Sequence, residues 1–161
     1  MPRRPFDPGH KPKFLVVLDE SAECSRAVRF AARRALRTGS DMVMLTVIDA
    51  GDFQHWLGVG DIMKQEALEA AERRIASEMA ACAALGDIVC EKVVRIGATL
   101  DELLKLIDED EDIAYLTLAS GVGSDGPGPL VAMVGRASQV FRLPVVIVPG
   151  GLSDAEIDAL A

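Results

Sequence analysis

Five short apolar runs alternate with amphipathic, helix-like stretches along the chain. The first run, residues 13–18, is apolar almost throughout, as expected for a strand buried on both faces of a parallel sheet. The other expected strands are Met42–Ile48, Ile88–Ile96, Ile113–Ala119 and Val145–Val148. Strands that alternate with helices predict an α/β fold, and right-handed crossovers leave few topologies. We therefore expect a single open, parallel, five-stranded sheet with helices on both faces.

The helix signals lie between these runs, and several of them begin or end at capping residues. The first helix is expected to start after Ser21, which can cap it, and to end near Gly39. The longest helical pattern runs from about Asp61 to Leu85. Thr99 to Glu102 is a capping box that opens a shorter helix, and a last helix is expected around Leu130 to Phe141. The first helix also has a basic outer face, made of Arg26, Arg29, Arg33 and Arg37.

The chain is expected to hold one domain flanked by two short segments. Its 161 residues fit a single well-covered core. We divide it into a flexible or loosely docked N-terminal arm (1–12), a central domain (13–149) and a C-terminal tail (150–161). The tail is expected to form a short helix that can dock on its own domain or on a partner subunit, with two apolar residues on one side, Ile157 and Leu160.

Composition and charge exclude several classes of function. The formal net charge of −8 argues against a general affinity for nucleic acid or anionic membranes. It also opposes polyphosphate binding unless positive groups are gathered locally. No apolar run approaches the roughly 18 residues that a membrane span needs. Cys24, Cys82 and Cys90 have no metal-ligand spacing, so no metal site is expected, and they indicate buried thiols in a reducing cytoplasm.

Polar and glycine-rich segments follow two of the predicted strands. Asp19 and Ser21 come after the first strand, and a stretch containing Gly121, Gly123 and Gly126 follows the fourth. In an open parallel sheet such strand ends meet at the edge where ligands bind. Asp19 can accept hydrogen bonds from a ribose hydroxyl or an adenine amino group, although a carboxylate here can also simply favour the start of a helix. These residues suggest a nucleotide site, or the remains of one.

The order of these elements resembles the universal stress protein family. The resemblance rests on the strand followed by Asp19 and Ser21, a second strand ending in residues 45–49, the late glycine loop and the closing run 143–148, and it covers about residues 12–149. It implies a flavodoxin-like domain, of the adenine nucleotide alpha hydrolase-like type, with strand order 3-2-1-4-5. It also implies that the protein is a homodimer, in a family with ATP-binding and non-ATP-binding branches.

The resemblance assigns roles to individual residues. Asp19 matches the family's adenine-contacting aspartate, and Val47 matches the position whose backbone recognises adenine. The ATP-binding branch uses Gly-x2-Gly, nine residues, and then Gly followed by Ser or Thr, so that backbone N–H groups and a helix N-terminus hold the phosphates. Here Gly123 and Gly126 supply the first part. The next suitable glycine follows after only eight residues, and an arginine replaces the hydroxyl residue, as Gly135 and Arg136.

The glycine loop therefore departs from the family's phosphate-binding pattern. Pro127 and Pro129 each remove an N–H donor, and Asp125 adds negative charge where a triphosphate would lie. Arg136 can compensate or can point into solvent. Three interpretations stay open. The first is the family's ATP site, with the backbone from Gly121 to Gly126 facing the phosphates. The second is a rigid turn in which Pro129 starts a helix, and the third is a site at residues 126–129 for a smaller or differently shaped ligand.

We predict a cytoplasmic stress-response binding protein of this family, non-catalytic, whose cofactor is ATP or another adenine nucleotide. The first alternative is a slow ATPase or another nucleotide-cleaving enzyme at the same cleft. No Ser-His-Asp or paired-carboxylate arrangement can be assembled from the sequence, and cations near the glycine loop are too few for efficient phosphoryl transfer. The second alternative is a dimeric interaction module that works without nucleotide. Trp56 is expected to serve in packing.

The expected partner is a second copy of the chain. In the order 3-2-1-4-5 the strand Val145–Val148 lies at a sheet edge, where unpaired backbone groups and valine side chains invite pairing. Nothing in this run is charged, and Pro149 interrupts only its end. A closed two-fold contact is the commonest form of such pairing. The sequence therefore predicts a homodimer through this strand.

Overall fold

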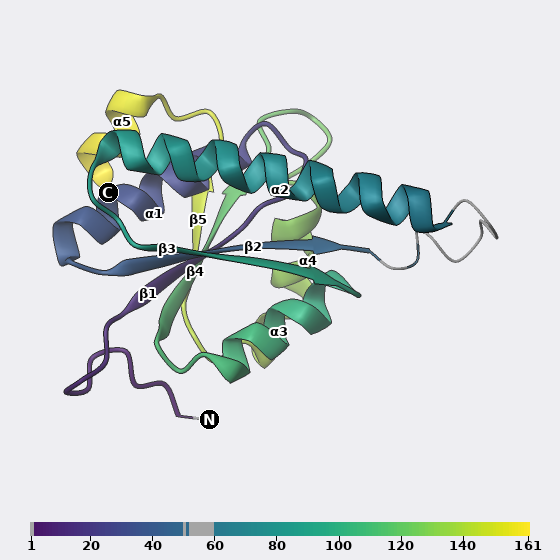
Figure 1. Ribbon diagram of the computed structural model, residues 1–161. Coiled ribbons are helices and arrows are strands. Elements are labelled where there is room, and N and C mark those ends of the chain that lie inside the picture. Colours follow the sequence, from purple (N-terminus) through teal and green to yellow (C-terminus); the bar gives the residue numbers. More distant parts are fainter. Residues whose placement is uncertain (1, 50, 52–59) are drawn as a thin grey trace.

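The computed structural model describes residues 2–49, 51 and 60–161, and it contains a single parallel sheet (Figure 1). The sheet order is β3-β2-β1-β4-β5, and every neighbouring pair is parallel. This confirms the predicted α/β fold and its strand order 3-2-1-4-5. The strands are β1 (Lys13–Val17), β2 (Asp41–Ile48), β3 (Cys90–Ile96), β4 (Ile113–Ser120) and β5 (Val145–Pro149).

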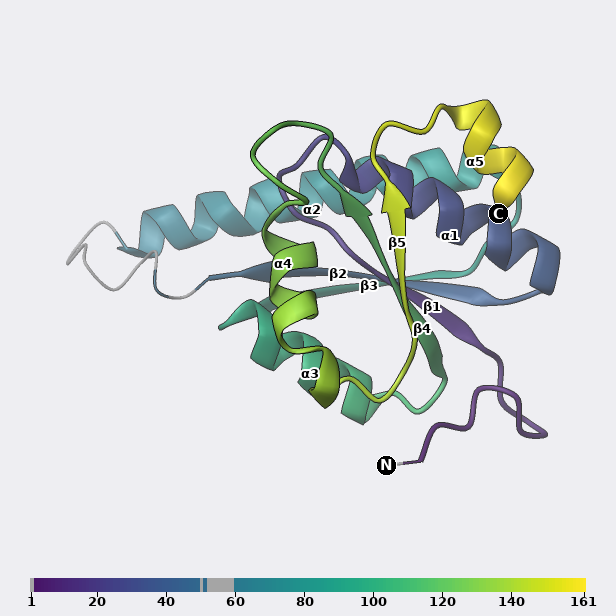
Figure 2. The ribbon, with the colours of Figure 1, turned by 180° about the vertical axis from the view of Figure 1, so that it is seen from behind.

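Helices cover both faces of the sheet, as Figures 1 and 2 show from opposite sides. On one face lie α1, α2 and the C-terminal α5, and on the other lie α3 and α4. The long α2 extends beyond the end of the sheet. The bounds are α1 (Cys24–Thr38), α2 (Gly60–Leu85), α3 (Thr99–Glu109), α4 (Pro129–Arg136) and α5 (Asp154–Leu160), with a short 3-10 turn, η2 (Ser138–Val140).

Strand β1 is buried on both faces and divides the core in two. Phe14 and Val16 pack with α1 and α2, whereas Leu15 and Val17 pack with α3 and α4. Because alternate side chains of a strand point to opposite faces, a strand covered on both sides must be apolar at every position. The continuous apolar run that the sequence shows is therefore a direct consequence of its central place in the sheet.

Three of the predicted helix ends are wrong. Ser21 does not cap α1, because its N–H and hydroxyl both donate to the Asp19 carboxylate, and the helix begins only at Cys24. Thr99 is already the first helical residue of α3, so it makes no capping hydrogen bond. The last large helix ends early, since Ala137 leaves the helical conformation and only η2 follows. Gly39, by contrast, ends α1 with a φ of 65°, as predicted.

The tail docks on its own domain. Helix α5 begins with a capping box between Ser153 and Glu156, and Ile157 is completely buried against the domain. Leu160, which was expected beside Ile157, is instead 67% exposed. In the part of the chain that the structure describes, the neighbour of α5 is α1.

The basic outer face predicted for α1 is the surface on which α5 docks. The Asp158 carboxylate accepts two hydrogen bonds from Arg29, at 2.8 and 2.7 Å, and two from Arg33, at 2.9 and 3.0 Å. Arg26 pairs with Asp154, and Arg37 donates to the Asp158 carbonyl. The hydrogen bonds from Arg29 and Arg33 lower the pKa of Asp158 from its ordinary value.

The N-terminal arm contacts the turn before β4. The Arg4 N–H donates to the Glu111 carbonyl at 3.0 Å, and Arg3 donates to the Asp110 carbonyl at 2.8 Å. His10 Nδ1 lies 2.6 Å from Asp112 Oδ1.

Within the described residues no helix is both long and apolar enough to cross a membrane. In the same residues, no group of three or more His, Cys, Asp or Glu side chains is placed to hold a metal ion.

We predict that Asp158→Asn loosens α5 from α1, because the neutral amide cannot accept charge-assisted bonds from two guanidinium groups. Hydrogen exchange of the α5 amides should become severalfold faster, whereas the control Asp87→Asn, in an exposed loop, should leave it unchanged. The lowered pKa of Asp158 determines how the docking of α5 on α1 depends on pH. The docking contribution of Asp158 is complete above the ordinary aspartate pKa of about 4 and is lost as the pH falls through the lower, folded-state value. Loosening on mild alkalinisation instead would contradict this assignment.

Candidate functional site

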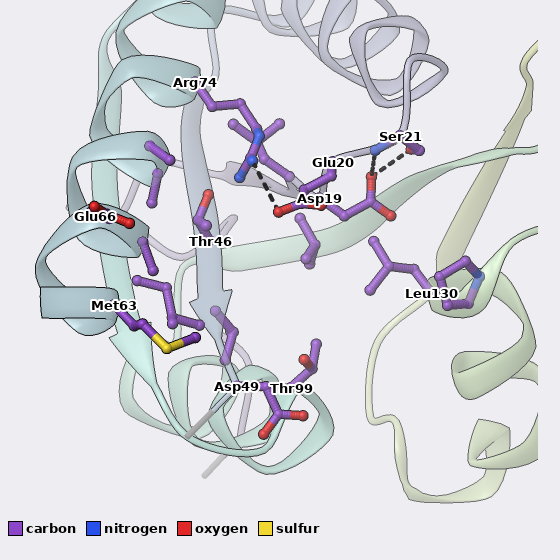
Figure 3. Close-up of a pocket in the computed structure, with 18 residues that line it drawn as sticks. Asp19, Glu20, Ser21, Thr46, Asp49, Met63, Glu66, Arg74, Thr99 and Leu130 are labelled. Atoms are coloured by element: carbon purple, nitrogen blue, oxygen red, sulfur yellow. Dashed lines mark hydrogen bonds and ion pairs between the residues drawn. The ribbon is translucent and has the colours of Figure 1, made fainter. Parts of the chain in front are cut away.

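A pocket of about 960 Å³ lies where β1 and β2 end (Figure 3). In the observed strand order, β1 and β4 are neighbours, and the chain passes from β1 to β2 on one side and from β4 to β5 on the other, so the connections after β1 and β4 run in opposite directions. Such switch points leave a crevice at the carboxyl edge of an open sheet. Its lining includes Asp19, Glu20 and Ser21 after β1, residues 46–49 of β2 and the segment after it, six residues of α2, and Thr99, Pro129 and Leu130.

Asp19 is held in one orientation by the residue two places further on. Its Oδ1 accepts a hydrogen bond from the Ser21 N–H at 2.9 Å and a second from the Ser21 hydroxyl. This local turn occupies Oδ1, while Oδ2 accepts no hydrogen bond from any residue that the structure describes. Asp19 lies beside Leu130 at the pocket edge in Figure 3. The carboxylate is therefore a fixed acceptor with one oxygen available to a ligand.

The end of β2 contributes two adjacent residues of different character. Val47 lines the pocket at the predicted position, and its side chain packs toward α3 and α4. Thr46 was not predicted. It lines the pocket and is only 3% exposed, yet its Oγ1 has no hydrogen-bond partner among the described residues. A buried hydroxyl without a partner carries a desolvation cost, which a hydrogen-bonding ligand group can offset.

Helix α2 forms a wall of the pocket that sequence reasoning missed. Its lining residues include a cluster of small side chains that lets the helix lie close above the strand ends. Arg74, also from this wall, lies 3.8 Å from the Glu20 carboxylate, and Figure 3 shows both beside Thr46. The repeat of alanines at helical spacing could have indicated a close contact. These alanines are Ala67, Ala70 and Ala71.

The charge of the pocket is predominantly negative. Four carboxylates line it, and Arg74 is the one cationic side chain among the described lining residues. The carboxylates belong to Asp19, Glu20, Asp49 and Glu66. Ligands with hydroxyl and amino donors suit such a lining better than ligands with several negative charges. Trp56 lies outside the described residues.

The glycine loop forms a separate, smaller pocket of about 470 Å³ next to the first, and Pro129 lines both. Gly121, Gly123 and Gly126 all line it, as does Glu23. The loop is closed by a hydrogen bond of 2.9 Å from the Gly121 N–H to the Pro127 carbonyl. Gly126 and Gly128 have φ values of 91° and 95°, which other residues rarely adopt.

The predicted site residues thus separate into three groups. Asp19, Ser21 and Val47 line the large pocket, and Gly121, Gly123 and Gly126 line the loop pocket. The last two predicted residues lie at the C-terminal end of α4, are exposed, and line neither pocket. They are Gly135 and Arg136.

The sequence model of the universal stress protein family matches residues 12–126, which is well over half of the chain. This chain belongs to the universal stress protein family. A comparison with curated proteins gave no match.

Solved structures of universal stress proteins share this fold. The protein UspA from Lactobacillus plantarum is 16% identical, with a TM-score of 0.69 over 85% of this chain and 97% of that chain. A universal stress protein in complex with cAMP is 22% identical, with a TM-score of 0.60 over 87% and 98%. One from Archaeoglobus fulgidus in complex with dAMP is 18% identical, with a TM-score of 0.53 over 85% and 97%. At these identities the likeness concerns the fold.

Proposed function

We propose that this universal stress protein is a non-catalytic binding protein for adenine nucleotides. The observation that carries the proposal is the Asp19 carboxylate, which Ser21 orients at the switch point of the sheet beside the end of β2. A fixed acceptor suits a ribose hydroxyl or an adenine amino group. The backbone of Val47 supplies groups for the base edge, and Thr46 offers a buried hydroxyl.

The size of the pocket and the known complexes support this ligand class. A volume of about 960 Å³ lies within the usual range for small-molecule sites, roughly 300–1,000 Å³. Two relatives of the same fold were solved in complex with cAMP and with dAMP, respectively. Both ligands contain adenine joined to a sugar and a single phosphate. Adenine, sugar and a short phosphate group are therefore the parts that we assign to this pocket.

Several features argue against the alternative of a nucleotide-cleaving enzyme. Phosphoryl transfer requires cationic groups around the phosphates, whereas the glycine-loop pocket is lined by the carboxylates of Glu23 and Asp125. The thiol of Cys24, 3.8 Å from the Asp19 carbonyl, is also unsuited to attack. Burial raises its pKa to about 11, so it stays protonated near neutral pH. The remaining alternative is a dimeric interaction module that binds no nucleotide.

We predict that Asp19→Asn weakens binding of adenosine or cAMP by about 1–3 kcal/mol, the contribution of a hydrogen bond to a charged group. The asparagine carbonyl can still accept from Ser21, so the turn is kept while the free acceptor is replaced by a donor. Isothermal titration calorimetry measures the change. Asp108→Asn, the same substitution at an exposed position outside both pockets, should bind like the unmutated protein. Equal affinity of the Asp19 and Asp108 variants would remove Asp19 from the site.

We also propose that the chain forms a homodimer through β5, in the cytoplasm. Strand β5 is paired only with β4 among the described strands, so its outer backbone edge is open, and Ile147 is 47% exposed on it. The proposed cytoplasmic location rests on the three free cysteines. The division into arm (1–12), domain (13–149) and tail (150–161) likewise stays a proposal.

We predict that Ile147→Lys converts the dimer into a monomer, because it places a charge in the proposed contact. The substitution should spare the fold, since the side chain is already exposed in the single chain. Sedimentation velocity at micromolar concentration distinguishes the two states. Leu160→Lys, on the exposed side of α5, is the matched control and should stay dimeric. A monomeric unmutated protein would refute the dimer.

A further inference from the structure

Glu23, the residue before α1, directs its carboxylate into the glycine loop. Its Oε1 would lie 3.2 Å from a Cβ placed at Gly121 and 3.9 Å from one placed at Gly128. Glu23 lines the loop pocket together with residues 121–123 and 125–129. Its carboxylate forms no hydrogen bond with the described residues. A negative charge therefore lies inside the pocket that the glycine loop forms.

We propose that Glu23 determines the ligand class of this site, by excluding an extended polyphosphate and leaving adenosine and singly charged adenine nucleotides such as cAMP as ligands. This inference rests on the proposed function, because it assumes that the base and ribose bind beside Asp19. Loop and large pocket adjoin at Pro129, so a ligand held in the large pocket would extend its phosphates toward the Glu23 carboxylate.

Packing holds Glu23 in this position. The segment after β5 passes directly over it, where a Cβ at Gly150 would lie 2.9 Å from the Glu23 Cβ and 2.3 Å from the Ser120 carbonyl oxygen. The Gly150 N–H donates to that same carbonyl at 3.0 Å. The side chain thus enters the loop between two close backbone segments. Rotation away from the loop is restricted on the Gly150 side.

Three backbone positions of the loop cannot donate a hydrogen bond to a phosphate. Pro127 and Pro129 have no N–H to donate, and the Gly121 N–H is already bonded to the Pro127 carbonyl. Asp125 adds a second carboxylate to the lining, and none of the described lining residues is cationic. ATP carries several negative charges that would come close to both carboxylates in a partly enclosed pocket, where solvent screening is incomplete. A ligand that ends in one negative charge avoids most of this repulsion.

If the Glu23 carboxylate binds a metal ion instead, the opposite change in ATP affinity is expected. A glutamate facing a phosphate loop could coordinate Mg²⁺ and so hold the metal complex of ATP. Replacing it would then weaken binding of Mg-ATP instead of strengthening it. The direction of the change on neutralising Glu23 separates exclusion from metal coordination.

Calorimetric titration with adenosine, cAMP and ATP, the last with and without Mg²⁺, tests the inference. The unmutated protein should bind adenosine and cAMP and should bind ATP at least about tenfold more weakly. Glu23→Gln should raise ATP affinity by about tenfold, and Glu23→Lys by more, while adenosine affinity stays within about twofold. Glu69→Gln, the same neutralisation on the exposed face of α2, should change none of these affinities. Thermal midpoints of the variants check that each is folded.

The outcomes separate the two levels of the proposal. If adenosine, cAMP and ATP all fail to bind, the proposed function is overturned and this inference with it. If adenosine binds but ATP binds equally well, or Glu23→Gln leaves their affinity ratio unchanged, only the role of Glu23 is overturned. Loss of Mg-ATP binding in Glu23→Gln would also overturn it, by assigning the carboxylate to a metal ion.

Discussion

The parallel pairing of β1 with strands on both of its sides is the constraint on which the site depends. Residues of β1 pair with β2 in one register from Lys13 to Val17, and with β4 in one register from Phe14 to Val16 after a shift at Lys13. The Leu18 N–H continues the pairing with β2 by donating to the Leu45 carbonyl at 2.8 Å. This ladder fixes where the backbone leaves the sheet. Asp19, the next residue, therefore emerges beside the end of β2, at the mouth of the crevice.

The proposed site that results from this pairing combines a large pocket, to which we assign the nucleoside, with an acidic glycine loop. Asp19 is oriented by Ser21, and Thr46 keeps a buried hydroxyl without a partner, so the large pocket has groups arranged for a polar ligand. The glycine loop keeps the positive φ angles of a tight turn, but Glu23 and Asp125 line it. The backbone shape of the loop suits an anion, whereas the two carboxylates repel one, and on this ground we propose that a polyphosphate is excluded.

A feature of the fold or of the site could be predicted from the sequence when it depends on residues that are close together along the chain. The strands and Asp19 follow from apolar runs and from residues at strand ends, and the family resemblance added the strand order and Val47. The structure has this strand order and places Asp19 and Val47 in the pocket. The α2 wall and Glu23 were missed, because their roles come from contacts between distant segments. A glutamate before a helix usually indicates capping. Nothing in the sequence around Glu23 shows that its side chain reaches the loop after β4. Gly135 lies near the C-terminal end of α4 and lines neither pocket, and this position too depends on how far the helix extends.

We propose above all that an adenine nucleoside binds at the ends of β1 and β2. Chemical-shift mapping by NMR, with adenosine added to the isotope-labelled protein, tests this proposal most directly. We predict saturable shifts concentrated in the backbone amides of residues 19–21 and 46–49, with smaller changes in the glycine loop. Saturable shifts confined to other surfaces, or no shifts at millimolar adenosine, would contradict it.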